Sequence, residues 1–318
     1  MPKRKPKPTP LKKLKSVLRG KKPPAVKAFT IIKLAPKLPS SAIMVMDDAL
    51  ADADPIVQVA IMDAYYEMTE DRYHQQDLER ILAKAAQGGD ASEELYMAAR
   101  LALGRVNGLA KDALGENYDP GLEIVAMAYE RAMPGKRREP EKSITVMIHG
   151  TWAADGEWWQ PGGDFFNYVK NKLKLKDLYG GSDRFKWSGK NRDSSRKKAA
   201  NSLSSWLHSH PATKINVFAH SHGANVAMLA THNDVQMNKL VMLSPPVRKD
   251  YYAKWGNVAE AFNIQAEFDP VVAIARGGQW FKHAKVKEKE LKAYGHSASH
   301  DPKVWKDEKL GKFIGIPW

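Results

Sequence analysis

The stretch Ile215-Asn-Val-Phe-Ala-His-Ser221-His-Gly-Ala-Asn225 decides the fold of this chain. Apolar residues of a β type lead into Ser221, and small residues in a helical pattern follow it. This order predicts a strand, a sharp turn and a helix, with the serine hydroxyl at the apex of the turn, as in a nucleophile elbow. The crowded turn needs small residues two positions before and after the serine, where Ala219 and Gly223 stand. Ser221 is therefore the candidate nucleophile.

Strand and helix patterns alternate on both sides of this stretch. We predict strands at 144–148, 214–219, 240–243 and 263–268, and helices at 164–173, 194–208 and 302–313. Strands that alternate with helices of this length indicate an α/β fold with a mostly parallel sheet and helices on both faces. Ligands of such sheets bind beyond the carboxyl ends of the strands, so we expect the site there.

A serine nucleophile needs a base, and the base needs an acid that orients it. Asp269 directly follows a predicted strand and is the candidate acid, with Glu267 as the alternative. An Asp-Pro pair is also common in turns, but its place after the elbow and two further strands favours the catalytic interpretation. Two candidate bases, His296 and His300, lie in a loop ahead of the last predicted helix.

The oxygen that becomes negative during acyl transfer needs N–H donors. One candidate is the backbone N–H of His222, the residue after the nucleophile. The other comes from the loop after the first predicted strand, where Trp152 is preferred and Thr151 is the alternative. We expect His149, at the start of that loop, to brace it by hydrogen bonding.

Tryptophans are concentrated in the same loop. Trp152, Trp158 and Trp159 are the candidate substrate-binding residues, because indole rings suit an apolar acyl or aromatic group. Their alternative role is to pack the loop onto the core. Tryptophans also suit a membrane interface, which makes a lipid substrate compatible with this pattern.

Residues 143–318 resemble the α/β-hydrolase superfamily. The elbow Ala-His-Ser221-His-Gly is similar to that of small bacterial lipases and esterases, and three further segments match positions of the family pattern: His149-Gly-Thr-Trp, Asp269-Pro-Val-Val and Gly295-His296-Ser. The resemblance implies a serine carboxylic-ester hydrolase with a Ser-Asp-His triad, an acyl-enzyme and no cofactor. The usual first two strands of the family are either absent or supplied by 27–33 and 42–46.

The resemblance also orders the two candidate bases. The family places its histidine about eight to nine residues ahead of the first buried aliphatic residue of the closing helix, here Val304. His296 has this spacing, which makes it the preferred base, whereas His300 stands beside Asp301-Pro302 and suits a capping or bracing role. A zinc site from His220, His222 and His232 lacks a carboxylate and a suitable spacing, so no metal is expected.

The chain of 318 residues has a formal net charge of +14, and nearly all of this excess lies near its start. Residues 1–46 hold 13 Lys or Arg and no acid, whereas the remainder carries 37 basic and 36 acidic side chains. We expect residues 1–25 to form a disordered basic tail that could bind an anionic membrane or an acidic partner. The first 25 residues contain no aromatic residue, which argues against nucleic acid.

The domain organisation follows from these patterns. We predict a mainly helical segment at 26–140, including helices at 92–114 and 120–133, a polar boundary at 134–140 and a catalytic domain at 141–318. The chain has no cysteine, no long apolar span and no secretory signal pattern, so we expect a cytoplasmic protein or one exported without a signal peptide. Alternative functions are a phospholipase or thioesterase effector at anionic membranes, and an inert hydrolase-fold binding protein.

Overall fold

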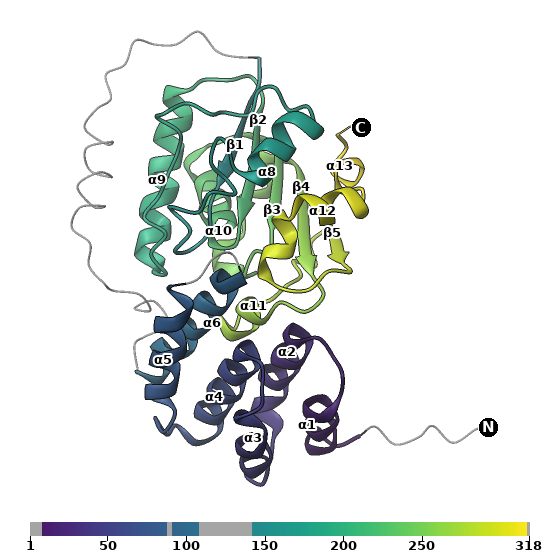
Figure 1. Cartoon of the computed structure of the whole chain (residues 1–318). Helices are drawn as coiled ribbons and strands as arrows, with labels where there is room; N and C mark the ends of the chain where they lie inside the picture. Colours follow the sequence, from purple (N-terminus) through teal and green to yellow (C-terminus); the bar gives the residue numbers. More distant parts are fainter. Residues whose placement is uncertain (1–7, 88–90, 108–141, 317–318) are drawn as a thin grey trace. The chain divides into compact units, whose positions relative to one another are not determined.

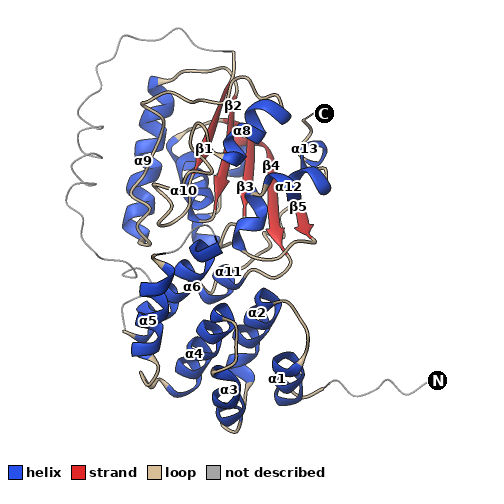
Figure 2. Ribbon diagram, in the orientation of Figure 1, coloured by secondary structure: helices blue, strands red, loops and turns tan. Residues whose placement is uncertain are grey.

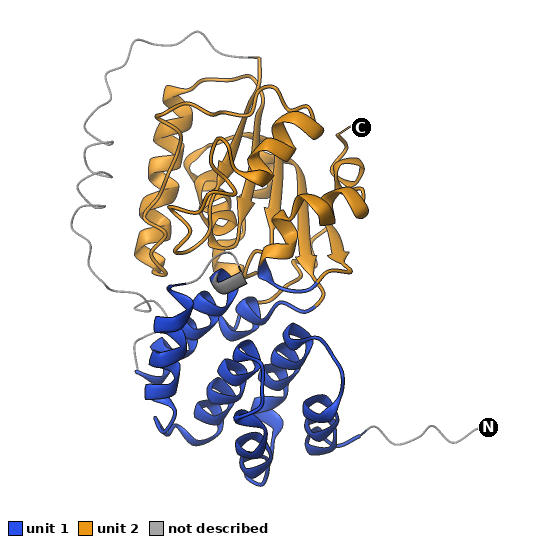
Figure 3. Ribbon diagram, viewed as in Figure 1, with its two compact units in different colours: residues 1–114, 268–276, 294–296 blue, residues 115–267, 277–293, 297–318 orange. Residues whose placement is uncertain are grey.

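The computed structural model describes residues 8–87, 91–107 and 142–316. The chain forms two compact units, coloured separately in Figure 3. Unit 1 comprises Met1–Leu114, Phe268–Arg276 and Tyr294–His296, and unit 2 comprises Gly115–Glu267, Gly277–Ala293 and Ser297–Trp318. Two short segments of the predicted catalytic domain thus belong to the helical unit, which a linear division of the sequence does not anticipate.

Unit 2 is built on a five-stranded parallel sheet with the strand order β1-β2-β3-β4-β5, which confirms the predicted α/β class (Figures 1 and 2). The strands are β1 (Ile144–Ile148), β2 (Ile215–His220), β3 (Met237–Leu243), β4 (Val258–Ala266) and β5 (Val286–Leu291). The sequence did not predict β5, because this strand reads Val-Lys-Glu-Lys-Glu-Leu and buries only its two ends.

Alternate residues of the strands join different core layers, as the pleat requires. In β1, Ile144, Val146 and Ile148 belong to the layer that contains α9 (Asp193–Ser209) and α10 (His222–Ala230). Met147 belongs to the layer formed with α8 (Asp164–Asn167), α12 (Pro302–Asp307) and α13 (Leu310–Phe313). Helices therefore cover both faces of the sheet, as the sequence predicts.

Short helical segments complete the element order. A π-helical turn, Tyr168–Lys172, continues α8, and 3-10 turns are formed by Ala35–Lys37, Thr231–Asn233, Lys249–Tyr251, Trp255–Asn257 and His296–His300. The predicted closing helix at 302–313 is divided into α12 and α13, with Lys309 in the left-handed conformation between them (φ 52°). That backbone conformation interrupts an α-helix, which explains the division.

Where it is described, unit 1 is built from helices. They are α1 (Pro10–Arg19), α2 (Pro24–Leu34), α3 (Ala42–Leu50), α4 (Pro55–Thr69), α5 (Gln75–Ala85), α6 (Ala91–Val106) and α11 (Pro270–Ile274). The start of α4 is set by its own residues, because the Asp54 carboxylate accepts a hydrogen bond from the Ile56 N–H (3.1 Å) and Pro55 occupies the first turn. Local capping chemistry thus sets this helix boundary.

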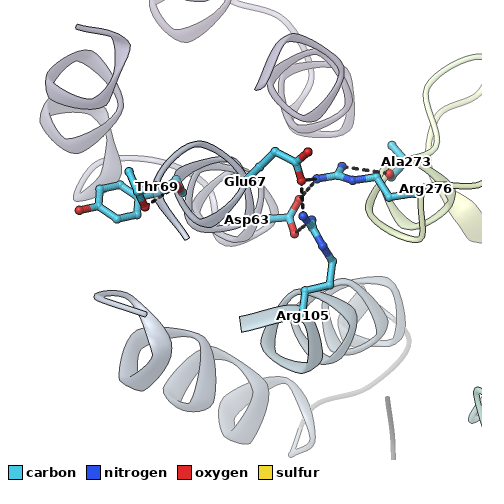
Figure 4. A network of polar contacts seen from close by, with 7 residues as sticks. Asp63, Glu67, Thr69, Arg105, Ala273 and Arg276 are labelled. Carbon is cyan, nitrogen blue, oxygen red and sulfur yellow. Dashed lines mark hydrogen bonds and ion pairs between the residues drawn. The ribbon is translucent and has the colours of Figure 1, made fainter. Parts of the chain in front are cut away.

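A cluster of ion pairs joins α4, α6 and the segment that follows α11 (Figure 4). Asp63 and Glu67 on α4 pair with Arg105 on α6 and with Arg276, which follows α11. Arg276 lies 3.0 Å from the Asp63 carboxylate and 2.9 Å from that of Glu67. Because the Asp63 side chain is only 1% exposed, both guanidinium groups compensate a buried negative charge.

The prediction of a disordered tail over 1–25 is wrong for residues 10–19, which form α1. Leu14 and Val17 are buried, and Thr9 caps the helix by accepting from the Lys12 N–H. Apolar residues three apart give this Lys-rich segment one face to bury, so it folds despite its composition. Segments 27–33 and 42–46, considered as strands, lie in helices α2 and α3.

The helix expected at 92–114 corresponds to α6 where it is described. The helix expected at 120–133 and the boundary expected at 134–140 lie outside the described residues. In the described ranges, none of the helices combines the length and the apolar character needed to cross a membrane.

Candidate active site

Ser221 stands between β2 and α10, at the strand–turn–helix junction that the sequence predicts. Its backbone is strained, with φ 52° and ψ −130°, and the residue is 5% exposed. Gly223 is required two positions later, because a Cβ at that position would lie 2.4 Å from the carbonyl oxygen of His149. Ala219, two positions earlier, is fully buried. The crowding predicted around the turn is therefore present.

The loop after β1 passes directly over the nucleophile. A Cβ on Gly150 would lie 2.8 Å from the Cβ of Ser221 and 3.3 Å from the carbonyl oxygen of His220. Only a glycine allows this approach. The backbone that follows Gly150 is thus held beside Ser221, where an oxyanion donor is needed.

The preferred donor from this loop is corrected by the structure. The Trp152 N–H donates a hydrogen bond to the carbonyl oxygen of Gly189 (2.9 Å), and Trp152 is left-handed (φ 57°). A donor already used in this way does not serve an oxyanion unless the bond breaks. Thr151, the alternative in the sequence, is therefore the better candidate for the second donor. The Gly189 contact is long-range, so local sequence gives no sign of it.

His149 braces the loop, as expected. The Trp187 N–H donates to Nε2 of His149 (3.4 Å), which leaves the proton on Nδ1 for a hydrogen bond to the carbonyl oxygen of Gly150 (2.8 Å). The imidazole also stacks on the Trp187 ring, at 5.7 Å between centroids. Burial lowers the pKa of His149 to about 4, so the ring is neutral at physiological pH.

The histidines that flank Ser221 have packing contacts. The His222 Nδ1 lies 2.9 Å from the Asn225 amide nitrogen within α10. The His220 ring meets Trp158 edge-on (5.3 Å) and His300 edge-on (4.7 Å). Both flanking residues are buried, with 1% of His220 and 6% of His222 exposed.

The candidate acid and the preferred base form a buried pair in unit 1. Oδ2 of Asp269 lies 2.7 Å from Nδ1 of His296, and both side chains are fully buried. The other carboxylate oxygen, Oδ1, accepts the Val272 N–H (3.0 Å) and so caps α11. With both oxygens engaged, the carboxylate has a fixed orientation toward the imidazole.

Two opposing effects act on the His296 pKa. Burial alone would lower it, but the Asp269 carboxylate raises it through its charge and its hydrogen bond, with a further contribution from Glu94. The net effect is a pKa above the usual value of 6.5. An imidazolium that forms at His296 is therefore stabilised, as a general base requires.

The alternative acid and base have other environments. Glu267 is exposed, so it does not provide the buried carboxylate that the imidazole needs. His300 stacks on Trp158 with 4.1 Å between ring centroids and an angle of 13° between the rings. Asp301 caps α12 by accepting the Lys303 N–H (2.7 Å), the capping role considered for His300. The contacts thus distinguish His296 from His300.

The three candidate substrate-binding tryptophans differ in exposure. The prediction is wrong for Trp159, which is 1% exposed, donates its indole N–H to the Ala153 carbonyl oxygen (2.9 Å) and lies in the core. Trp152 and Trp158 are half-buried. The sequence alone predicts the same role for the adjacent residues Trp158 and Trp159. In the structure Trp159 packs in the core, whereas Trp158 remains partly accessible.

Sequence reasoning did not find Glu94. This α6 residue lies close to Asp269 and His296 within unit 1, and burial raises its pKa to about 7, with a second contribution from the Asp269 charge. Acidic residues are common in the first turn of a helix, so Glu93-Glu94 has no distinctive pattern. Within the described part of the chain, no three His, Cys, Asp or Glu side chains lie close enough together to hold a metal ion.

No family model matches this sequence, and no curated protein matches it. Among solved structures, a protein of unknown function from Agrobacterium tumefaciens aligns with 14% identity over 56% of this chain and 93% of its own, with a TM-score of 0.35. An uncharacterized protein from Bacillus cereus aligns with 14% identity over 87% of this chain and 99% of its own, also with a TM-score of 0.35.

Proposed function

We propose that this protein is a serine hydrolase of carboxylic esters that acts through an acyl-enzyme on Ser221. The observation that carries the proposal is the backbone of Ser221, at φ 52° and ψ −130° between a strand and a helix. A non-glycine residue in such a conformation costs about 1–3 kcal/mol and is retained mainly at functional sites. Here the strained residue is a serine that directly follows a parallel strand, which is the position of the nucleophile in a nucleophile elbow.

The buried pair of Asp269 and His296 supports the same function. Because the carboxylate accepts the Nδ1 proton of His296, the lone pair of the neutral imidazole is on Nε2. Chain connectivity is also favourable: β2 ends directly before Ser221, β4 ends three residues before Asp269, and β5 ends five residues before His296. These strands are parallel, so all three segments leave the sheet at the ends where α/β proteins bind ligands.

The proposed reaction has two halves. The Ser221 oxygen attacks the ester carbonyl carbon while Nε2 of His296 takes the hydroxyl proton, and the backbone N–H groups of His222 and Thr151 bind the resulting oxyanion. The oxyanion collapses, the bond to the alcohol oxygen breaks, and His296 returns the proton to the leaving alcohol. Water then attacks the acyl-enzyme with the same base, which releases the carboxylic acid and regenerates Ser221.

Lipid esters at anionic surfaces are the second candidate substrate class. Lys12, Lys13 and Lys15 are exposed on α1, whereas Leu14 and Val17 on the same helix are buried. This arrangement holds the cations on the outer face of a folded helix, where they could contact anionic headgroups. The half-buried rings of Trp152 and Trp158 suit either a simple apolar ester or a lipid acyl chain.

The deciding experiment compares Ser221→Ala with Ser244→Ala. Ser244 is a matched control, because it also follows a strand of the sheet and has a positive φ (46°), but Pro245 and not a helix comes after it. Hydrolysis of 4-nitrophenyl butyrate should fall about 10³-fold or more in Ser221→Ala and remain in Ser244→Ala. A fluorophosphonate should label Ser221 of the wild type, as read by peptide mass spectrometry.

Other results would reject this assignment. Labelling at Ser244, or full activity of a folded Ser221→Ala variant, contradicts the proposed nucleophile. A wild type that neither hydrolyses esters, thioesters and phospholipids nor reacts with the fluorophosphonate would favour an inert binding protein. Comparison of butyrate, long-chain, thioester and phospholipid substrates would then identify the substrate class of an active enzyme.

A further inference from the structure

A carboxylate from the helical unit lies against the segment that carries His296. Glu94 is on α6, and a Cβ added to Gly295 would lie 2.6 Å from its Oε2 and 3.2 Å from its Oε1. Gly295 has φ 92°, a backbone conformation that residues other than glycine rarely adopt. Both the conformation and the free space at Gly295 thus allow the Glu94 carboxylate to reach the backbone beside His296.

The carboxylate also has polar contact with the histidine itself. Glu94 accepts a hydrogen bond from the backbone N–H of His296, and its charge acts on both Asp269 and His296. Its Oε1 is buried and accepts no hydrogen bond from the residues that the structure describes. A buried carboxylate oxygen without a hydrogen bond is costly, so its presence beside a second carboxylate supports a function for Glu94.

The segment before Asp269 is held by the same unit. The Gly295 N–H donates to the Phe268 carbonyl oxygen (3.0 Å), which links the two segments directly. The Phe268 ring meets Phe29 of α2 edge-on at 5.5 Å. After α11, Arg276 pairs with α4, so each end of the Asp269 segment is attached to the helices.

We propose that Glu94 is a positioning residue for His296, which fixes the backbone of this histidine and adds a second negative charge beside its imidazole. The inference rests on the proposed function of the Asp269–His296 pair and gives the N-terminal helices a role in it. These helices would hold the acid and the base of the reaction, since Phe268–Arg276 and Tyr294–His296 belong to the same compact unit as the helices.

The two carboxylates have different tasks under this proposal. Asp269 receives the Nδ1 proton and selects the ring tautomer, whereas Glu94 holds the main chain and acts on the ring only through its charge. The charged groups that act on the imidazole are Asp269, Glu94 and the neighbouring Glu93. With the pKa of Glu94 near 7, its charge develops in the range where the base must become neutral.

The test measures the His296 pKa by NMR titration of the histidine side chains, with the signal assigned by a His296→Gln variant. Glu94→Gln preserves the shape and the hydrogen-bond acceptor but removes the charge. It should lower the His296 pKa by about 0.5–1 unit and reduce kcat/KM for 4-nitrophenyl butyrate about tenfold. Glu79→Gln, the same change at an exposed position of α5, should alter neither quantity.

The NMR measurement separates this inference from the proposed function. If the wild type hydrolyses no ester, the proposed function fails, while the change in His296 pKa still reports whether Glu94 acts on the histidine. A folded Glu94→Gln variant with an unchanged His296 pKa and unchanged kcat/KM overturns the inference. If Glu94→Gln does not fold, Glu94→Asp decides: it keeps the charge and should retain the raised pKa, and a pKa at or below that of an exposed histidine contradicts the proposal.

Discussion

Gly150 and Ser221 lie so close that a Cβ added to the glycine would stand 2.8 Å from the Cβ of the serine. Both atoms are fixed to backbone, one in the loop after β1 and the other in the elbow after β2. The loop that is proposed to supply the Thr151 N–H is therefore packed on the nucleophile without any free space. A small change in either backbone should move the donor relative to the developing oxyanion.

Gly150→Ala should consequently slow acylation strongly. We expect the rate of fluorophosphonate labelling at Ser221 to fall about 100-fold, the loss typical of one oxyanion donor. The melting temperature should also fall, because overpacking of a buried site costs about 1–3 kcal/mol. Gly256→Ala is the matched control, since an added Cβ meets no atom within 4 Å there. Normal labelling of Gly150→Ala would show that the loop can shift without consequence.

The pH profile of the wild type follows from the raised His296 pKa. The base must be neutral, so kcat/KM should increase with pH and reach half its limit above 6.5, the usual histidine value. Activity is then lost as the pH falls through the folded-state pKa. The profile should be recorded with a soluble ester between pH 5 and pH 9, and a midpoint clearly below 6.5 would contradict the assignment of His296.

Asp269→Asn tests the carboxylate of the pair. An amide does not carry the charge that raises the His296 pKa, and burial alone lowers that pKa, so the midpoint of the profile should move down. The wrong tautomer of the imidazole should also reduce kcat about 10³–10⁴-fold. Glu267→Gln, at the exposed alternative, should leave both quantities unchanged. If Glu267→Gln lowered kcat and the midpoint while Asp269→Asn changed neither, Glu267 would be the acid.

The sequence predicted the parts of the molecule that local patterns encode. Apolar runs and the crowded turn located four strands and the elbow, and a Ser-Asp-His order located the buried pair of Asp269 and His296. It did not predict β5, because solvent-facing Lys and Glu hide the strand pattern. It also predicted disorder where α1 forms. The prediction followed the many Lys and Arg residues of this segment and gave too little weight to the apolar residues Leu14 and Val17.

The remaining differences depend on tertiary contacts between distant segments. Trp152 N–H bonds to Gly189, and Trp159 enters the core, although both were expected to serve the substrate side of the site. Glu94 lies far from His296 in the sequence and beside it in the fold. A chain pattern specifies which face a residue occupies in its own element, but it does not specify which other element will cover that face.

Arg276→Met should destabilise the helical unit. The substitution keeps an extended apolar side chain but removes one of two guanidinium groups from the buried Asp63 carboxylate (Figure 4). Loss of a partner from a buried charge costs several kcal/mol, and because Arg105 remains we expect about 1–3 kcal/mol in the free energy of unfolding. Chemical denaturation measures it. Arg80→Met is the control: its side chain is 77% exposed, so no measurable change is expected.

The exposed lysines of α1 test recruitment to lipid. Deletion of residues 1–25 would remove the buried Leu14 and Val17, so substitution of Lys12, Lys13 and Lys15 by Gln is the cleaner change. Hydrolysis of a soluble ester should stay within about twofold, while binding to phosphatidylserine vesicles should weaken by about 1 kcal/mol per lysine. Added salt should reduce wild-type binding. Equal, salt-insensitive vesicle binding by both proteins would reject recruitment.

Glu94 should also make stability depend on pH. Its pKa is raised from 4.5 to about 7 in the folded protein, so folding favours the protonated carboxyl. This contribution is fully present below the unfolded-state value and is lost as the pH rises through about 7, with a fall on the order of 1–3 kcal/mol. Glu94→Gln cannot ionise and should lack this fall. The variant should therefore melt at a higher temperature than the wild type at pH 8, and the difference should shrink toward pH 5. Equal pH dependence of both melting temperatures would show that the carboxylate is not buried beside the Asp269–His296 pair in solution.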